Sequence, residues 1–169
     1  DIERKDAMGV MIYRNFQDKK LSGLGLGMMR LPVVNSDDAV VDEVAAAEMI
    51  DYAYQNGINY FDTARAYTDS EEKLGEAFHD RREKIVISTK SQGKTKEQVL
   101  ADLDTSLKQL RTDYVDILQL HNIPAVPDLE DENSPYYALV EAKKQGKIRF
   151  IGITNHRLPI AREAVESGL

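Results

Sequence analysis

From residue 21 onward, short apolar runs alternate with longer segments in which apolar and polar residues recur at helical spacing. Several of the apolar runs are nearly continuous, as in strands that are covered on both faces. The last four of them begin roughly thirty residues apart. The five predicted strands lie within LSGLGLGMMRL (21–31), INYFDT (58–63), KIVISTK (84–90), YVDILQLH (114–121) and KIRFIGITN (147–155).

The segments between the apolar runs carry signals for helix starts. Thr95 and Gln98 form a capping box, and Ser134 stands as an N-cap before a proline. The predicted helices include DEVAAAEMIDYAYQNG (42–57), TKEQVLADLDTSLKQL (95–110), SPYYALVEAKKQG (134–146) and LPIAREAVESGL (158–169). A further helix follows the second strand, and its start is predicted at one of two pairs, Thr68 with Glu71 or Asp69 with Glu72.

Strand–helix alternation of this kind predicts βαβ units and a parallel sheet. The alternation alone leaves a doubly wound sheet and a (β/α)8 barrel open. GLGLG (23–27) resembles part of a dinucleotide-binding fingerprint, but that motif requires G-x-G-x-x-G running into a helix. Here MMRLP (28–32) follows instead. The glycines therefore favour a closely packed barrel strand.

Composition narrows the class of protein. The chain has 169 residues, a net charge of −7 and no cysteine. The acidic balance argues against a nucleic-acid partner or an anionic membrane surface. The lack of cysteine excludes disulfides and thiol chemistry within this sequence and is compatible with the cytoplasm. No apolar run reaches the ~18 residues of a membrane span, and His79, His121 and His156 lack the spacing of a metal site, so none is expected.

Polar side chains recur where the predicted strands end. They are Arg30, Asp62, Lys90, His121 with Asn122, and Thr154 with Asn155 and His156. Tyr67 lies in the loop after the second strand. Because the carboxyl ends of barrel strands meet on one face, where barrel enzymes carry their sites, we expect these residues to converge.

Four of these residues suit one reaction. A tyrosine titrates near ~10, and a neighbouring lysine ammonium would lower that pKa and make it a better acid at neutral pH. A partly buried Lys90 needs a counter-ion, which Asp62 can supply. His121 can donate to a substrate oxygen. An acid, its tuning cation and an oxygen-binding donor suit the reduction of a carbonyl, in which charge builds on oxygen.

Four motifs together resemble the aldo-keto reductase family: FDTARAYTDSEEKLGEAF (61–78), VISTK (86–90), VDILQLHN (115–122) and GKIRFIGITNH (146–156). The resemblance extends over residues 11–169, and it implies a (β/α)8 TIM-barrel fold. YRNF (13–16) resembles the N-terminal hairpin that closes the bottom of such barrels.

The resemblance also implies roles for individual residues. Asp62, Tyr67, Lys90 and His121 would form the catalytic tetrad, with Tyr67 as the general acid. NADPH would be the cofactor, with NADH possible, and its contacts would come from Asp62, Thr154 and Asn155. Arg30, His121 and Asn122 would contact a small-molecule carbonyl substrate.

A complete barrel of this type has eight βα units and typically ~250 residues, whereas this sequence supplies about five. We therefore expect residues 11–169 to be a partial barrel, truncated after about five units. Residues 1–10, which do not begin with Met, are expected to be a leader or tag-like segment. Such a fragment is expected not to bind NADPH detectably. The physiological substrate and the oligomeric state stay open.

Two other functions remain open at this point. The first is a cofactor-binding or regulatory subunit on the same scaffold, although such a module has no need of both Tyr67 and Lys90. The second is a Schiff-base lyase that uses Lys90, which its pairing with Asp62 disfavours. The long loop NIPAVPDLEDEN (122–133) is interpreted either as a solvated acidic segment or as a mobile wall of the substrate pocket.

Overall fold

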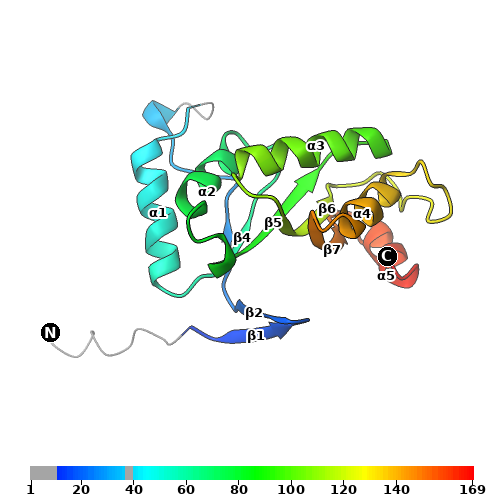
Figure 1. The fold of residues 1–169 in the computed structure, drawn as a ribbon, viewed down its shortest axis with the longest axis horizontal. Coiled ribbons are helices and arrows are strands. Elements are labelled where there is room, and N and C mark those ends of the chain that lie inside the picture. Colours follow the sequence, from blue (N-terminus) through cyan, green and yellow to red (C-terminus); the bar gives the residue numbers. More distant parts are fainter. Residues whose placement is uncertain (1–10, 37–39) are drawn as a thin grey trace, which may run out of the picture.

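The computed structural model describes residues 11–36 and 40–169. The expected leader, residues 1–10, lies outside the described residues. The first described element is an antiparallel hairpin, β1 (Tyr13–Phe16) and β2 (Lys19–Ser22). Figure 1 shows it apart from the main body. The predicted N-terminal hairpin is therefore confirmed.

The main body is a parallel sheet whose five strands follow one another in chain order, β3-β4-β5-β6-β7. The strands are β3 (Leu26–Gly27), β4 (Tyr60–Asp62), β5 (Val86–Ser91), β6 (Val115–Leu120) and β7 (Ile148–Ile153). The helices are α1 (Glu43–Gln55), α2 (Ser70–Phe78), α3 (Lys96–Gln109), α4 (Pro135–Lys144) and α5 (Leu158–Glu166), with short 3-10 turns η1 (Val34–Ser36) and η2 (Arg82–Lys84). This is the wall of a (β/α)8 barrel over about five units, as predicted.

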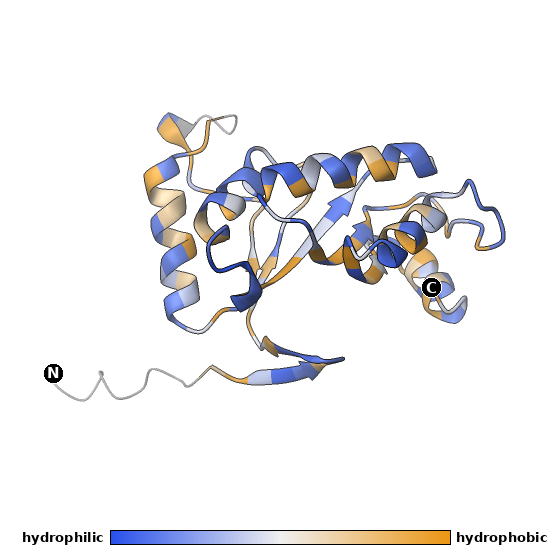
Figure 2. Ribbon diagram, in the orientation of Figure 1, coloured by the Kyte–Doolittle hydropathy of each residue, from blue (hydrophilic) through white to orange (hydrophobic). Residues whose placement is uncertain are grey.

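The core lies between the sheet and the helices that surround it from α1 to α5 (Figure 1). Alternate strand residues such as Phe61, Ile87 and Leu118 are almost fully buried and face that layer. Figure 2 shows α3 with apolar and polar residues on different faces, and its buried residues include Val99 and Leu103. Burial of this layer removes apolar surface from water and holds the strands in register.

Asn59, just before β4, anchors the hairpin to the amino-terminal end of the sheet. Its side chain accepts a hydrogen bond from the Ser22 backbone at 2.8 Å and donates to the Lys20 carbonyl at 2.8 Å. The ring of Phe16 meets Phe150 of β7 edge-on, with 5.0 Å between centroids. The hairpin is thus fixed at the end of the sheet opposite to the ends of the strands that carry the predicted site.

The first predicted strand is shorter than expected. Within 21–31 the structure assigns residues 21–22 to the hairpin and only Leu26–Gly27 to the sheet. The glycines between them allow close contacts. A Cβ on Gly25 would lie 2.6 Å from the Tyr60 ring, and one on Gly23 would lie 3.0 Å from the Ile12 carbonyl oxygen. Residues 23–25 therefore connect the hairpin to the parallel sheet, although the sequence predicts one continuous strand.

The predicted helix caps were only partly right. Thr95 accepts a hydrogen bond from the Gln98 backbone, as expected. Ser134 occupies the N-cap position of α4, but its hydroxyl makes no capping hydrogen bond. Of the two predicted starts of α2, the one at Asp69 has the right position, because Asp69 is the N-cap of a helix that begins at Ser70, but its side chain makes no capping hydrogen bond. The start at Thr68 is wrong. Among the described residues no helix is both long and apolar enough to cross a membrane.

Candidate active site

The carboxyl ends of β4 and β5 bring a carboxylate and an ammonium together. Asp62 is the last residue of β4, and its Oδ2 lies 2.6 Å from Nζ of Lys90 in β5. The same Nζ donates to the Thr63 carbonyl oxygen at 2.7 Å. The Lys90 side chain is 6% exposed and that of Asp62 is 31% exposed. The buried cation is thus paired, as predicted, with a carboxylate that still reaches solvent.

Tyr67 and His121 lie beside this ion pair. Tyr67 is in the loop between β4 and α2, and its ring centroid is 5.0 Å from Lys90 Nζ. His121 directly follows β6, and its ring meets that of Tyr67 edge-on with 6.0 Å between centroids. The structure therefore brings together all four residues of the predicted tetrad.

Burial, followed by the nearby Lys90 ammonium, holds the pKa of His121 below its ordinary value of 6.5. A lowered pKa favours the neutral ring at neutral pH, in which one nitrogen carries a proton and the other does not. Nδ1 is buried and has no hydrogen-bond partner among the described residues. The ring can therefore act as a neutral donor toward a bound oxygen.

Thr154 and Asn155 follow β7 and are linked to the loop after β6. The Asn122 backbone donates to Oγ1 of Thr154 at 2.9 Å. Nδ2 of Asn155 donates to the Ile123 carbonyl at 2.5 Å, and Oδ1 accepts from the Arg157 backbone at 2.7 Å. Both side chains keep hydrogen-bonding capacity, because the Thr154 hydroxyl still has its proton and Asn155 a second N–H.

Comparison with known proteins assigns the family. The model of the aldo/keto reductase family matches residues 23–168. That match covers the whole parallel sheet and all four residues of the tetrad. The chain belongs to the aldo/keto reductase family.

Relatives within the family include reductases and a dehydrogenase. Methylglyoxal reductase DkgB of Salmonella typhimurium is 35% identical over 150 residues, which cover 86% of this chain and 52% of DkgB. L-galactose dehydrogenase of Arabidopsis thaliana is 37% identical over 155 residues, which cover 83% of this chain and 47% of the plant protein. The chain thus spans about half the length of these curated relatives.

Solved structures of aldo-keto reductases support the assignment of the family. The holo form of aldo-keto reductase AKR11C1 from Bacillus halodurans superposes with a TM-score of 0.74 and 31% identity, covering 92% of this chain and 54% of that one. The thermostable aldo-keto reductase Tm1743, in complex with the inhibitor epalrestat, gives a TM-score of 0.75 and 28% identity, covering 92% and 58%. The described half-barrel therefore has the fold of the corresponding part of this family.

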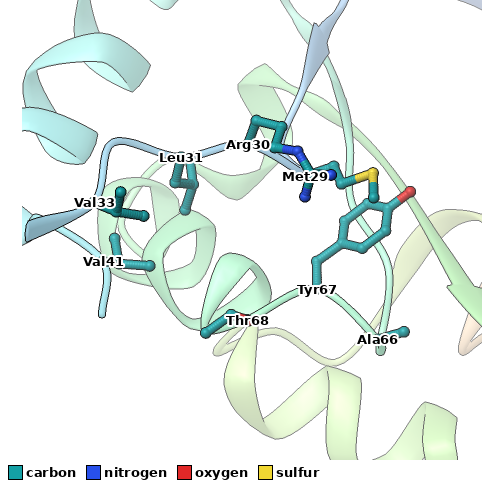
Figure 3. A pocket seen from close by; sticks show the side chains of 8 residues that line it. All are labelled: Met29, Arg30, Leu31, Val33, Val41, Ala66, Tyr67 and Thr68. Atoms are coloured by element: carbon teal, nitrogen blue, oxygen red, sulfur yellow. The ribbon is translucent and has the colours of Figure 1, made fainter. Parts of the chain in front are cut away.

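Arg30, a predicted substrate contact of this aldo/keto reductase chain, lies across from Tyr67. Figure 3 shows both side chains, with Met29, at a cavity of about 160 Å³. Val33 and Val41 form the other end of that cavity. Arg30 itself is exposed. Its guanidinium is thus available at the edge of the site, and its predicted contact with substrate stays a prediction.

A larger cavity, of about 610 Å³, is lined in part by His121. Its wall includes the apolar first half of the long loop after β6, from Ile123 to Pro127, together with His121 and Asn122. The acidic residues that follow, Asp128 and Glu130 to Glu132, are exposed. The second half of the loop is therefore the solvated acidic segment of the first interpretation, and the role of the first half as a mobile wall of the substrate pocket stays a prediction.

Several buried polar residues near the site escaped the sequence analysis. Glu71 is 1% exposed and contacts Arg65 and Thr89. Nearer the middle of the sheet, Nε2 of Gln119 donates to Oγ of Ser88 at 2.7 Å. Ser88 and Gln119 are polar residues inside apolar runs, whereas Glu71 stands among other polar residues near a predicted helix start. No local pattern marks their contacts, because the partners lie far apart along the chain.

Proposed function

We propose that the native polypeptide carrying this chain reduces aldehydes or ketones to alcohols with NADPH, NADH being the second choice of cofactor. The observation that carries this proposal is the cluster around Lys90, whose Nζ lies 2.6 Å from Asp62 and 5.0 Å from the Tyr67 ring centroid. The names of the relatives, which include a reductase and a dehydrogenase, support the reaction class.

In this proposal Tyr67 is the general acid. Its Oη donates a proton to the carbonyl oxygen as negative charge develops there. The Lys90 ammonium stabilises the phenolate that remains, and Asp62 keeps the ammonium in place. His121, neutral because burial lowers its pKa, donates a hydrogen bond that orients the carbonyl.

The residues present fit one end of a nicotinamide cofactor. A primary carboxamide needs both donors and acceptors, and Thr154 and Asn155 keep capacity of both kinds beyond their contacts with the loop after β6. Asp62, with its exposed carboxylate edge, is the third proposed contact. When bound, the cofactor supplies the hydride that the carbonyl carbon accepts.

The two cavities support a small-molecule carbonyl as the substrate. The larger one is lined by Leu120, Ile123 and the proline-rich loop, which suits an apolar substituent next to His121. Arg30, in the wall of the smaller cavity, and Asn122, in the wall of the larger one, are the proposed polar contacts. We also propose a cytoplasmic location, since a chain without cysteine is suited to a reducing compartment.

We further propose that catalysis needs more than the five βα units described. The chain spans about half of its curated relatives, and a complete barrel has eight units. Titration of the 169-residue chain with NADPH, followed by cofactor fluorescence, is expected to show no saturable binding. Saturable binding would show that the half-barrel holds the cofactor alone.

The test of the activity itself is a Tyr67→Phe variant of the native polypeptide, assayed for NADPH consumption with a panel of aldehydes and ketones. We expect a loss of about 10³-fold or more in kcat, because the ring keeps its packing but lacks the proton. Tyr52→Phe, an exposed tyrosine on α1, is the matched control and should retain full activity. Turnover by the Tyr67→Phe variant at the native rate would refute the proposal.

The same assay separates the two alternative functions. A regulatory subunit on this scaffold would bind NADPH but reduce no carbonyl in the panel. A Schiff-base lyase would become covalently labelled at Lys90 on borohydride treatment with a carbonyl compound. The two oxygens that accept from Lys90 Nζ, at 2.6 and 2.7 Å, leave the amine poorly placed to act as a nucleophile.

A further inference from the structure

Glu71 is a nearly fully buried carboxylate that the proposed mechanism does not use. It lies in the first turn of α2 and is 1% exposed. Its Oε2 is 2.8 Å from Nη1 of Arg65, and its Oε1 accepts a hydrogen bond from the Thr89 hydroxyl at 2.6 Å. A buried charge is costly unless it is paired and hydrogen-bonded, and Glu71 is both.

Each partner of Glu71 is within two residues of a member of the tetrad. Thr89 precedes Lys90 in β5, and because side chains alternate along a strand, the two point to opposite faces of the sheet. Arg65 is two residues before Tyr67, and its backbone N–H donates to the Lys90 carbonyl at 3.0 Å. Glu71 therefore joins the strand that carries Lys90 to the loop that carries Tyr67.

The loop from Thr63 to Ser70 is held at several points. Thr63 and Ser70 share a hydrogen bond between their buried hydroxyls at 2.7 Å, which closes the base of the loop. Asp69 has φ 48, in the left-handed region that non-glycine residues seldom adopt. Arg65 Nη1 also donates to Oε1 of Gln109 at the end of α3. A conformation of this kind persists only where contacts hold it, and Glu71 supplies two of them.

We propose that Glu71 is a positioning residue, which fixes the Tyr67 hydroxyl relative to Lys90 and to the bound carbonyl. Its catalytic consequence rests on the reductase function proposed above. Glu71 contacts no reacting atom and acts through Arg65 and Thr89. If it only stabilised the fold, its loss would resemble the loss of any other buried ion pair.

Asp116 offers the matched control. Its Oδ2 is 2.7 Å from Nη2 of Arg82, with side-chain exposures of 1% and 9%. Asp116 is the second residue of β6, at the amino-terminal end of the sheet and away from the tetrad. Removing its charge breaks this buried ion pair, and the 3.3 Å pair of Asp116 Oδ1 with Arg149 Nη1, without touching the loop that carries Tyr67.

The test compares Glu71→Ala, Glu71→Gln and Asp116→Asn in the native polypeptide. We expect Glu71→Ala to lower kcat by about 10- to 100-fold, because small misplacements of a reacting group are costly, while KM for NADPH changes by less than about twofold. Glu71→Gln still accepts from Thr89, so its loss should be several-fold smaller. Asp116→Asn should lower the melting temperature but leave kcat within about twofold. An unchanged kcat in Glu71→Ala, or an equal loss in Asp116→Asn, would overturn the proposal.

A second readout does not depend on activity. In NMR spectra with labelled tyrosine rings, the Tyr67 signals are assigned as those missing from Tyr67→Phe. Glu71→Ala is expected to shift or broaden these signals, and Asp116→Asn to leave them in place. A wild-type protein that reduces no carbonyl would refute the reductase function but leave this readout valid. Unmoved Tyr67 signals in a folded Glu71→Ala variant would overturn the positioning role itself.

Discussion

The two side chains of the Lys90–Asp62 ion pair are unequally buried. Replacing one or the other should therefore lower the free energy of unfolding by different amounts. Lys90 is 6% exposed and Asp62 is 31% exposed. In Asp62→Asn the ammonium stays buried, and the Thr63 carbonyl remains as its hydrogen-bond acceptor in the described part of the chain. In Lys90→Met the buried stem is replaced by an apolar side chain of similar length, and the remaining carboxylate reaches water. Asp62→Asn should therefore be the more destabilising change.

The magnitudes follow from burial. Breaking a fully buried pair so that one charge is left alone costs about 3–5 kcal/mol. Since Asp62 is about a third exposed, we reduce this to about 2–3 kcal/mol for Asp62→Asn. Lys90→Met should cost about 1 kcal/mol, because the remaining carboxylate is hydrated. The double variant should then resemble Lys90→Met, which gives a coupling energy of about 2–3 kcal/mol for two residues in contact.

The assay is urea unfolding followed by far-ultraviolet circular dichroism, with all variants measured at neutral pH and equal salt. Asp104→Asn is the control, because Asp104 forms a 2.7 Å ion pair with Lys147 in which both side chains are at least one-third exposed. That change should cost less than about 1 kcal/mol. A larger loss from Lys90→Met than from Asp62→Asn would show that burial does not set these costs, and a coupling energy near zero would show that the pair does not stabilise the fold.

Two further predictions concern stability. Gly75→Ala should lower the free energy of unfolding by about 3 kcal/mol in urea, since the new Cβ would lie 2.3 Å from the Gln109 carbonyl oxygen. Gly27→Ala is the control: a Cβ there meets nothing within 4 Å, so the change should be neutral to within about 0.5 kcal/mol. Equal losses in the two variants would contradict the prediction. Because the folded state holds the pKa of His121 below 6.5, the unfolded chain takes up that proton first as pH falls, so His121 contributes a loss of stability below about pH 6.5. His121→Asn should therefore lose less stability than wild type between about pH 7 and pH 5, and an equal or steeper loss would count against a lowered pKa.

The strands and the tetrad were accessible to sequence analysis for a physical reason. Parallel strands place their carboxyl ends at one edge, so Asp62, Lys90 and His121 had to lie near one another once the strands were recognised. The sequence predicts a single strand over the glycine-rich run, which is wrong. Gly23 lies against Ile12, beside the hairpin, whereas Gly25 lies against Tyr60 in the parallel sheet.

The role of Glu71 was not accessible in the same way. In the sequence it is one of two adjacent glutamates near a predicted helix start, where exposed acidic residues are common. What distinguishes Glu71 is burial by Thr89, which is 18 positions away, and by Arg65, whose side chain folds back from the loop. Contacts of this kind depend on how α2 packs against β5, and no periodicity encodes them.

The proposed function requires that this chain carry the proton-donating half of a nicotinamide-dependent carbonyl reductase. The most direct measurement is a single-turnover reaction of the native polypeptide with an aldehyde and NADPH deuterated at the transferable position of the nicotinamide ring. We expect the alcohol to carry deuterium on the former carbonyl carbon, and the rate to fall by about 10³-fold in Tyr67→Phe with NADPH still bound. An alcohol without deuterium, or an unchanged rate in Tyr67→Phe, would contradict the account.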